Sequence, residues 1–365
     1  MSTDKSTIAV ALDVMGADGH PGTIIDGGLW AARDNRGTLH VVLVGQSHLI
    51  EDYLSGQKDV PDNVSIQNAD NIVAMADTPT DGIRKKDSSI AVGLKMQKEK
   101  KANAFVSAGN TGAVMASSIL ILGRIENLNR PAIASFFPSS KERPTLVLDV
   151  GANAECKPIN LYQFGVMGSV FCSVMFDVNE PRVGLLSIGE EKSKGNELIF
   201  QSRKLLANSC LNFAGNVEGR DILSSKVDVV VTDGFIGNIV LKFAESIEGY
   251  LTSKLRRQVS TNIFSRVGAA LMKPFLRRLR QAFDYAEYGG APLLGADGVS
   301  IICHGSSSPK AIKNAVATAA KMARHNINGK IRHRMTETIN GNDNAEKDQR
   351  QDNGDRIIRS TRSAH

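Results

Sequence analysis

Short apolar runs rich in valine and isoleucine alternate with helical patterns along most of the chain. The runs predict strands at residues 7–13, 38–44, 104–107, 145–149, 182–187, 211–215 and 227–232. Apolar residues at helical spacing predict helices at residues 23–33, 88–101, 112–122, 161–176 and 197–206, and a long helix from residue 238. This alternation is typical of an α/β fold, an α/β/α sandwich with a largely parallel sheet.

Five β-branched runs end in clusters of Gly, Asn, Ser and Asp. They are Ile8–Asp18, Ala104–Gly112, Leu146–Asn153, Val229–Asn238 and Val299–Ser308. In an open parallel sheet, ligands bind beyond the carboxyl ends of the strands, and glycine lets backbone amides approach them closely. A helix N-terminus that follows such a loop favours an anion. One loop of this kind is more often a plain turn, but five predict that several converge on one anion site.

These loops contain most of the candidate site residues. Those expected to bind phosphate or substrate are Asp13, Gly16, Ser107, Gly109, Asn110, Thr111, Gly112, Asn153, Asp233, Gly234, Gly237 and Ser306. Asn238 and His304 are candidate catalytic residues. Asp13 and Asp233 have a second interpretation, because Asp at a strand end commonly caps a turn or a helix. His304 could donate a proton or hold an anion, and it could equally be a structural histidine.

Catalytic signatures of other enzyme classes are absent from the sequence. It has no G-x-x-x-x-G-K-[ST] phosphate loop, no G-x-S-x-G nucleophile, no H-E-x-x-H metal pair and no G-x-G-x-x-G spacing. We therefore expect no metal and no cofactor, and a reaction in which a substrate supplies the nucleophile. Inorganic phosphate that attacks an activated acyl group needs orientation and stabilisation of the oxyanion. Lys194 could supply an ammonium for this purpose, or it could be a solvated loop lysine.

Composition narrows the class of protein further. With 42% hydrophobic and 22% charged residues over 365 positions, the chain is an ordinary globular protein, and 5% aromatic residues argue against base stacking on single-stranded nucleic acid. The four cysteines lie far apart, which indicates neither a disulfide framework nor a zinc site. No stretch approaches 18 uncharged apolar residues and the N-terminus lacks a signal-peptide pattern, so we expect a cytoplasmic protein without a membrane span.

One segment breaks the alternation through its charge. Residues 251–283 carry eight Lys or Arg and no Asp or Glu. Apolar residues at helical spacing predict a protruding helical hairpin at residues 245–285, with Ile263 and Phe264 at its tip. The hairpin could pack in the core or on a second copy of the chain, and it could also contact an anionic membrane surface.

The end of the chain differs from the rest in composition. Residues 331–365 are polar and of mixed charge, which predicts a disordered tail. The remainder, residues 1–330, is expected to form a single α/β catalytic domain with two lobes around a cleft.

The glycine-rich segments also occur together in a known family. LDVMGAD, SAGNTGAVMA, LDVGAN, GEEKSKGNE, TDGFIGNIVLK and HGSSSPKAI follow one another in this order. They resemble the motifs of the bacterial phosphate acyltransferases called PlsX, and the resemblance extends from about residue 8 to residue 326. That family is similar in fold to phosphotransacetylases and to isocitrate and isopropylmalate dehydrogenases.

The resemblance implies an enzyme of lipid synthesis. Members transfer a long-chain fatty acyl group from acyl carrier protein to inorganic phosphate, and the acyl phosphate feeds glycerol-3-phosphate acylation in phospholipid synthesis. The implied partners are acyl carrier protein, phosphate, a second copy of the chain, an anionic membrane surface and a glycerol-3-phosphate acyltransferase, with no nucleic acid. The implied location is cytoplasmic with peripheral membrane association. The family's lysine falls on Lys194, which becomes the leading catalytic candidate.

Two positions depart from the family pattern. Ala17 stands where the family has glycine, and Gly19 separates Asp18 from His20, so the family's histidine has no direct counterpart. The nearest alternative function is a phosphotransacetylase-like enzyme that uses acyl-coenzyme A. A dehydrogenase on the related fold is a weaker alternative, and a non-catalytic scaffold on the membrane surface belongs to a different class.

Overall fold

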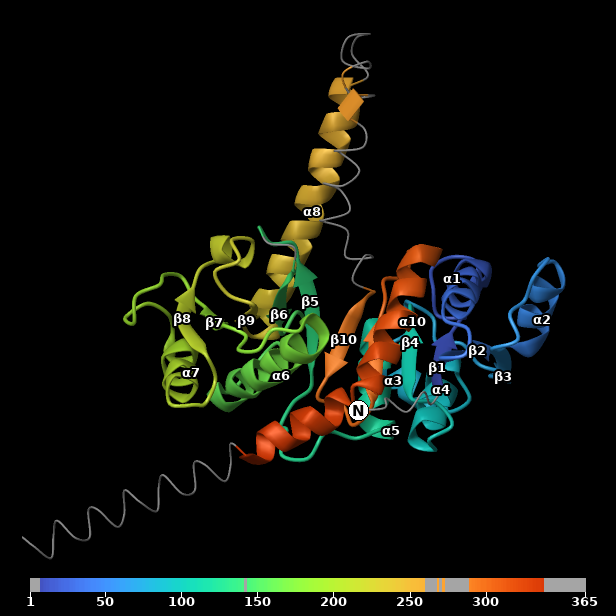
Figure 1. Cartoon of the computed structure of the whole chain (residues 1–365), viewed down its shortest axis with the longest axis horizontal. Helices are drawn as coiled ribbons and strands as arrows, with labels where there is room; N and C mark the ends of the chain where they lie inside the picture. The colour runs from blue at the N-terminus through green and yellow to red at the C-terminus, as the bar shows by residue number, and fades with distance from the viewer. Residues whose placement is uncertain (1–6, 141–142, 260–267, 269–270, 273–288, 338–365) are drawn as a thin grey trace, which may run out of the picture.

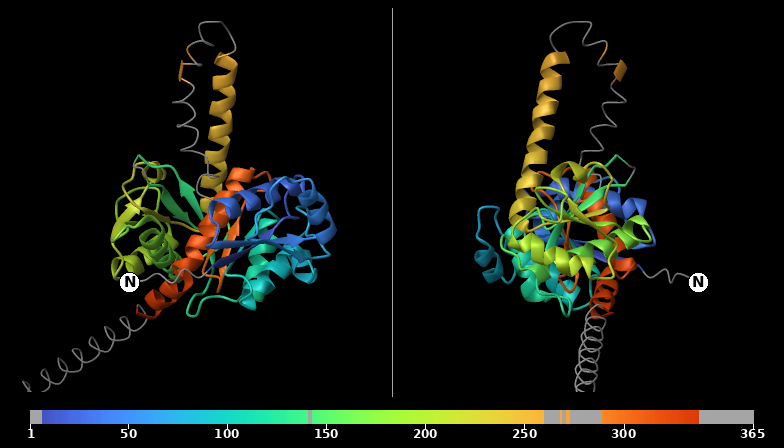
Figure 2. Two further views of the ribbon diagram at one scale, coloured as in Figure 1. Left: turned by 45° about the vertical axis from the view of Figure 1, so that its right-hand side comes forward. Right: turned by 90° about the vertical axis from the view of Figure 1, so that its left-hand side faces the viewer.

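The computed structural model describes residues 7–140, 143–259, 268, 271–272 and 289–337. They contain one eleven-stranded sheet with helices on both faces (Figures 1 and 2). The strands are β1 (Ile8–Asp13), β2 (Leu39–Gly45), β3 (Val64–Asn68), β4 (Ala104–Ser107), β5 (Ala132–Phe137), β6 (Thr145–Leu148), β7 (Val183–Leu186), β8 (Phe213–Val217), β9 (Val229–Val231), β10 (Ala291–Leu294) and β11 (Val299–Ile302). Their order across the sheet is β3-β2-β1-β4-β11-β10-β5-β6-β9-β7-β8. The predicted α/β fold with a largely parallel sheet is confirmed.

Several helices begin where the sequence supplies a cap. The helices are α1 (Pro21–Asp34), α2 (Ser47–Ser55), α3 (Pro79–Arg84), α4 (Ser89–Lys98), α5 (Thr111–Ile121), α6 (Pro158–Phe176), α7 (Glu197–Ala207), the 3₁₀ turn η1 (Gly219–Ile222), α8 (Gly234–Val259) and α10 (Pro309–Arg324). The side chains of Ser88, Asn196 and Ser308 each accept a hydrogen bond from an amide in the first turn of α4, α7 and α10. These bonds satisfy amides that have no partner within the helix.

Two antiparallel strands, β5 and β10, reverse the direction of the sheet at its centre. β10 pairs antiparallel with both β11 and β5, and β5 pairs antiparallel with β6. On either side, β3-β2-β1-β4-β11 and β6-β9-β7-β8 are each parallel throughout. The two half-sheets therefore run in opposite directions.

The register of the central strands brings the carboxyl ends of the two half-sheets close together. At the end of β11, Ile302 pairs with Ala291, the first residue of β10. Further along β10, Leu293 pairs with Ile133 of β5. The carbonyl of Ile133 accepts a hydrogen bond from the amide of Val150, just beyond β6, at 3.0 Å. A short length of central strand thus joins the loop after β11 to the loop after β6.

The core lies on both faces of the sheet, as the nearly continuous apolar strands require. Along β2, Val41 and Leu43 belong to one hydrophobic cluster, while Val42 and Val44 belong to the other. Side chains of α1, α6 and α10 complete the first cluster, and those of α4 and α5 complete the second. The helices cover the faces of the sheet, and loops at the strand ends line the pocket.

The expectation that no uncharged apolar stretch approaches 18 residues is wrong for helix α6. This helix has 19 residues, none of them charged, and its mean hydropathy is 1.4. Its length and composition would therefore allow it to cross a membrane. In this structure 67% of the stretch is buried, and Phe164 and Phe171 are fully enclosed. Within the described part of the chain it is the single helix with this composition, and its burial identifies it as a core helix.

The first part of the predicted disordered tail is folded. Residues 327–337 are helical, and Ile327, Ile331 and Met335 are buried in the main hydrophobic cluster. The start of the segment predicted as a disordered tail, residues 331–365, therefore belongs to the folded body because its apolar positions recur at helical spacing. Residues from 338 onward lie outside the described part of the chain.

Helix α8 extends well beyond the body of the molecule (Figures 1 and 2). It corresponds to the first arm of the predicted hairpin at residues 245–285. The expected tip residues, Ile263 and Phe264, lie outside the described residues, so their membrane contact stays a prediction. The base of α8, by contrast, is packed tightly into the body.

The base of α8 meets the loop after β6 at Gly237, where a Cβ would overlap the carbonyl oxygen of Asp149. Gly237→Ala should lower the free energy of unfolding by roughly 1–3 kcal/mol or more, because packed backbone on both sides must shift. Gly249→Ala in the same helix is the matched control, since a Cβ there meets nothing within 4 Å. It should raise the free energy of unfolding by up to about 1 kcal/mol. Urea denaturation measures both, and equal stabilities would contradict this packing.

Candidate active site

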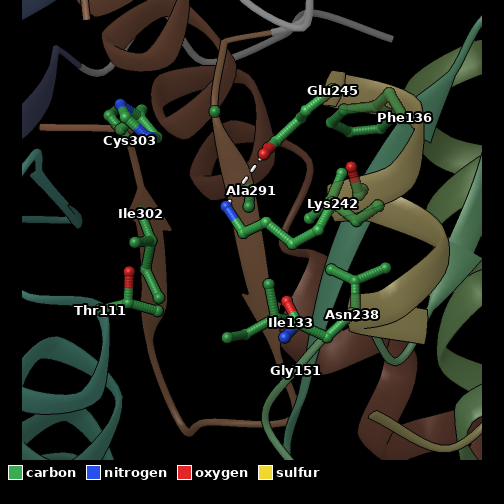
Figure 3. Close-up of a pocket in the computed structure, with 15 residues that line it drawn as sticks. Thr111, Ile133, Phe136, Gly151, Asn238, Lys242, Glu245, Ala291, Ile302 and Cys303 are labelled. Atoms are coloured by element: carbon green, nitrogen blue, oxygen red, sulfur yellow. Dashed lines mark hydrogen bonds and ion pairs between the residues drawn. The ribbon is translucent and has the colours of Figure 1, made fainter. Parts of the chain in front are cut away.

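A pocket of about 310 Å³ lies where the carboxyl ends of the two half-sheets meet. In Figure 3, α8 and Phe136 of β5 lie on one side of the pocket, Ile302 and Cys303 at the end of β11 lie on the other, and β10 lies between them. The lining residues are Thr111, Ile133, Ser135, Phe136, Val150, Gly151, Asn238, Leu241, Lys242, Glu245, Gly290, Ala291, Ile302, Cys303 and His304. Four of the five predicted loops contribute to it.

Three of the predicted site residues line this pocket. Thr111 is the first residue of α5, Asn238 lies near the start of α8, and His304 follows β11. All three are exposed to solvent. The pocket therefore gathers a hydroxyl, an amide and an imidazole from three strand-end loops, as the sequence pattern predicts for an anion site.

The ring of His304 is oriented by Ser306, another predicted residue. The Ser306 amide donates to Nδ1 of His304 at 3.2 Å, and the Ser306 hydroxyl lies 2.8 Å from the same atom. Because Nδ1 accepts from the amide, the neutral ring carries its proton on Nε2. Ser306 is not among the lining residues, and its observed contact is with His304.

The loop after β1 supports the site without lining it. The buried Asp13 carboxylate accepts hydrogen bonds from the Ser107 hydroxyl at 2.7 Å and the Met15 amide at 3.0 Å. Burial raises the pKa of Asp13. The Ser107 hydroxyl also accepts from the Gly109 amide at 3.0 Å, and a Cβ on Gly16 would lie 2.6 Å from the Cα of Gly109. These contacts hold the loops after β1 and β4 together.

Two further predicted residues fix the start of α5. The Asn110 side chain accepts from the Ala113 amide at 3.0 Å and donates to two carbonyls of the segment 75–77, at 3.0 and 2.8 Å. Gly112 packs beside Pro79, whose ring would lie 2.8 Å from a Cβ at position 112. Neither residue lines the pocket, and both position the helix whose first residue does.

Asp149 organises the loop after β6, and it lies in the LDVGAN motif although it is not among the predicted site residues. Its carboxylate accepts hydrogen bonds from the amides of Ile133 (2.9 Å), Gly151 (3.3 Å), Ala152 (3.0 Å) and Asn153 (2.7 Å), and from the Asn153 side chain (2.9 Å). Burial raises the pKa of Asp149, while these hydrogen bonds favour its charged form. The network fixes the backbone that forms one wall of the pocket.

The start of α8 packs on this same loop. Asp233 caps the helix, because its carboxylate accepts from the Ile236 amide at 2.9 Å. The Gly234 amide donates to the carbonyl of Asn153 at 2.8 Å, and a Cβ on Gly234 would lie 2.7 Å from that oxygen. The observed role of Asp233 is therefore that of a cap, and these contacts place Asn238 at the pocket.

Lys194 lies on the exposed loop between β7 and α7 and is not among the residues that line the pocket. Its carbonyl accepts from the Ser187 hydroxyl at 3.2 Å and from the Asn216 side chain at 3.3 Å. Gly195 follows with a φ of +126°, a conformation that favours glycine. The structure thus fixes the backbone of this loop, and a catalytic role for Lys194 stays a prediction.

Two charged residues of the pocket are not among the predicted site residues. Lys242 and Glu245 form an ion pair with 2.9 Å between Nζ and Oε2, and Figure 3 shows both side chains reaching into the pocket from α8. They lie four and seven residues beyond Asn238, which places all three on one face of a helix. This spacing was visible in the sequence, because Asn238 and Lys242 both lie in the motif TDGFIGNIVLK.

Cys303 also lines the pocket, but its thiol is protonated at neutral pH. Burial raises the pKa of this thiol to about 12, so only about one molecule in 10⁴ carries the reactive thiolate at pH 8. Over the described residues, no group of three or more His, Cys, Asp or Glu side chains is placed to hold a metal ion.

A family profile described as "Fatty acid synthesis protein" matches residues 8–330. The chain belongs to this family. The phosphate acyltransferase of Heliobacterium modesticaldum is 47% identical over 320 residues, which cover 87% of this chain and 95% of that protein. The phosphate acyltransferase of Geotalea daltonii is 43% identical over 329 residues, which cover 90% of this chain and 94% of that protein.

Solved structures of proteins with other names share the fold of this member of the fatty acid synthesis family. A phosphotransacetylase from Streptococcus pyogenes has a TM-score of 0.60 at 15% identity, over 87% of this chain and 94% of that one. A 4-hydroxythreonine-4-phosphate dehydrogenase from Klebsiella pneumoniae has a TM-score of 0.52 at 12% identity, over 87% of this chain and 100% of that one. At these identities the likeness concerns the fold alone, and it confirms the expected phosphotransacetylase-like and dehydrogenase-like architecture.

Alkylation with iodoacetamide at pH 8 tests the state of the pocket thiol. Cys210 is exposed, whereas Cys303 and Cys172 are buried and burial raises their pKa values. In the native protein we expect Cys210 to react at least about 10³ times faster than Cys303. Peptide mass spectrometry measures the labelling, with urea-unfolded protein as the control in which all cysteines react. Comparable native rates at Cys210 and Cys303 would contradict a buried, protonated pocket thiol.

Proposed function

We propose that this chain transfers a fatty acyl group from a thioester to inorganic phosphate. A phosphate oxygen attacks the carbonyl carbon, the C–O bond forms as the C–S bond breaks, and the leaving sulfur takes up a proton. The products are an acyl phosphate and a free thiol. Relatives named phosphate acyltransferase, which match 87% to 90% of the chain, support this reaction.

The pocket is the observation that carries the proposal. It offers an amide, a hydroxyl and an imidazole to an anion, beside apolar side chains such as Ile133, Phe136 and Ile302 that suit an acyl group. Among the described lining residues the single thiol, that of Cys303, is protonated. A site of this kind orients an external nucleophile and stabilises the developing oxyanion instead of forming a covalent intermediate.

The polar groups receive roles from their chemistry. The Asn238 amide and the Nε2–H of His304 donate hydrogen bonds to phosphate or to the carbonyl oxygen that becomes negative. Thr111 adds a hydroxyl at the N-terminus of α5, where the partial positive charge of the helix favours an anion. Lys194, on the loop after β7, is the candidate ammonium for the same developing charge.

Acyl carrier protein is the proposed acyl donor, and phospholipid synthesis through glycerol-3-phosphate acylation is the proposed fate of the product. Carrier proteins are acidic, so basic surface residues suit this partner. In the basic run 84–86, Arg84 and Lys86 are exposed, whereas Lys85 pairs with Asp77 at 2.6 Å. Two of the three charges thus face solvent at a candidate docking patch.

The test of the proposed function is a direct assay of acyl phosphate, trapped as the hydroxamate. We expect product from palmitoyl carrier protein and phosphate, much less product from palmitoyl-coenzyme A, and no loss of turnover with a chelator. Product from the coenzyme A thioester alone would favour the phosphotransacetylase-like alternative. Reversible loss of all turnover with the chelator would overturn the metal-free chemistry, and no product from either donor would overturn the function.

Lys194→Ala should lower kcat by about 10²–10³-fold, the usual effect of removing one donor to a developing oxyanion. Lys192→Ala is the matched control, because Lys192 is an exposed lysine of the same loop. It should stay within about twofold of the wild type, as surface substitutions usually do. Steady-state kinetics and a melting curve are measured for each variant. Equal kinetics in the two variants would return Lys194 to the role of a solvated lysine.

We further propose two contact surfaces, one on the exposed face of α8 for a second copy of the chain and one in the basic segment 251–283 for a membrane. On the described part of α8, apolar side chains are exposed along one stripe, namely Phe235, Ile239, Phe243, Ile247 and Tyr250. Exposed apolar surface of this kind marks interaction sites, and a second copy of the chain is the proposed occupant. The basic segment 251–283 suits anionic headgroups, which would give a cytoplasmic protein peripheral membrane association.

Two double variants separate these contacts. Phe243→Asp with Ile247→Asp should yield monomers in light scattering, because the stripe would carry two charges. Ile263→Asp with Phe264→Asp should abolish pelleting with anionic vesicles and leave the dimer intact. A dimer that persists in the first variant would exclude the stripe as its interface. Unchanged vesicle binding in the second would exclude the predicted tip.

A further inference from the structure

Helix α8 places an ion pair in the pocket, and neither of its residues has a role in the proposed acyl transfer. Lys242 lies one helical turn beyond Asn238, and Glu245 lies on the same face one turn further. Both side chains point from α8 into the space beside β10 (Figure 3). Among the described residues that line the pocket, Lys242 is the single lysine or arginine.

The geometry of the pair leaves Lys242 able to bind an anion. Its Nζ lies 2.9 Å from one oxygen of Glu245, and 57% of the lysine side chain is accessible to solvent. An ammonium has three N–H donors, and the contact with Glu245 occupies one of them. The other donors can therefore serve a ligand in the pocket while the pair is intact or after it opens.

The presence of Glu245 in an anion-binding pocket requires an explanation, because its carboxylate repels an anionic ligand. An exposed ion pair within one helix adds little to helix stability, so stabilisation of α8 is a weak explanation for it. A carboxylate that competes with the ligand for Lys242 has a clear effect, since it weakens the binding of every anion in the pocket. That includes both the phosphate substrate and the acyl phosphate product.

We propose that Lys242 binds the phosphate group of substrate and product, and that Glu245 is a competing counter-ion that limits this affinity. The inference rests on the proposed function, since it assigns the phosphate subsite of the same pocket. Phosphate enters by replacing Glu245 as the partner of Lys242. When acyl phosphate leaves, Glu245 returns to the ammonium, so Lys242 has an anionic partner both with and without the ligand.

The test measures the KM of phosphate and the KM of the acyl donor separately, at constant ionic strength so that added phosphate does not change screening. Lys242→Met should raise the KM of phosphate by about tenfold or more, because a charge-assisted contact is lost. Glu245→Gln should lower the KM of phosphate by about two- to fivefold, because a competing charge is removed. In both variants the KM of the acyl donor should change by less than about twofold.

A second Lys–Glu pair of the chain provides matched controls. Lys101 and Glu99 lie 2.7 Å apart between Nζ and Oε2, and both are exposed. They precede β4, at the edge of the sheet opposite to its carboxyl end. Lys101→Met and Glu99→Gln therefore make the same charge changes without touching the pocket, and the KM of phosphate should stay unchanged in both.

Opposite shifts of the phosphate KM in the two pocket variants are the decisive result. A rise of the phosphate KM in both variants, or changes that appear only in the melting temperature, would assign the pair a structural role and overturn the proposal.

The rise in melting temperature on adding inorganic phosphate provides a readout without turnover, and Lys242→Met should abolish it. A wild type that makes no acyl phosphate but keeps this rise would refute the proposed function and retain Lys242 as an anion-binding residue. A wild type that shows neither this rise nor any acyl phosphate would overturn both.

Discussion

The reversal of strand direction at β5 and β10 is the constraint on which the candidate active site depends. In a sheet that is parallel throughout, all carboxyl ends lie along one edge. Here the two half-sheets run in opposite directions, and the antiparallel pair is short enough that the loop after β11 meets the loop after β6. The pocket forms at this meeting point, so residues from α5, α8 and β11 share one cavity although they are far apart in the chain.

Buried carboxylates hold these loops in place. Asp13 joins the loops after β1 and β4 through Ser107, and Asp149 draws together the amides of its own loop. Removing a carboxylate from water is unfavourable, which raises the pKa of both groups, and the hydrogen bonds from amides and hydroxyls offset part of that cost. Glycine then allows the helix and loop backbones to approach so closely that a single methyl group would not fit at position 237. Much of the glycine and Asp content of the motifs is therefore used to build the site.

Helix α8 links the site to the outer surface of the molecule. Its base is fixed against the Asp149 loop, its inner face supplies Asn238, Leu241, Lys242 and Glu245 to the pocket, and its outer stripe remains exposed. One rigid element thus carries both polar groups suited to phosphate and an apolar surface suited to a partner. An acyl group transferred in the pocket is insoluble in water, so a site close to a surface that meets other apolar material fits the proposed chemistry.

The sequence by itself determined the class of fold, most of the strands and helices and the loops that carry the site. These features follow from local rules, because the periodicity of apolar residues, the caps and the glycine-rich strand ends are set by neighbours in the chain. Thr111, Asn238 and His304 were found in this way, and they do line the pocket. The antiparallel strands β5 and β10 were not recognised, since a short apolar strand does not encode the direction of its neighbours. The sequence could not distinguish residues that face the ligand from residues that support the loops. Asp233 and Ser306 were therefore predicted to bind the ligand, although their observed contacts are with α8 and with His304. Asp149 and Lys242 were not among the predicted site residues. That distinction depends on which side chains converge in space, and only the tertiary structure, through the sheet reversal and the packing of α8, decided it.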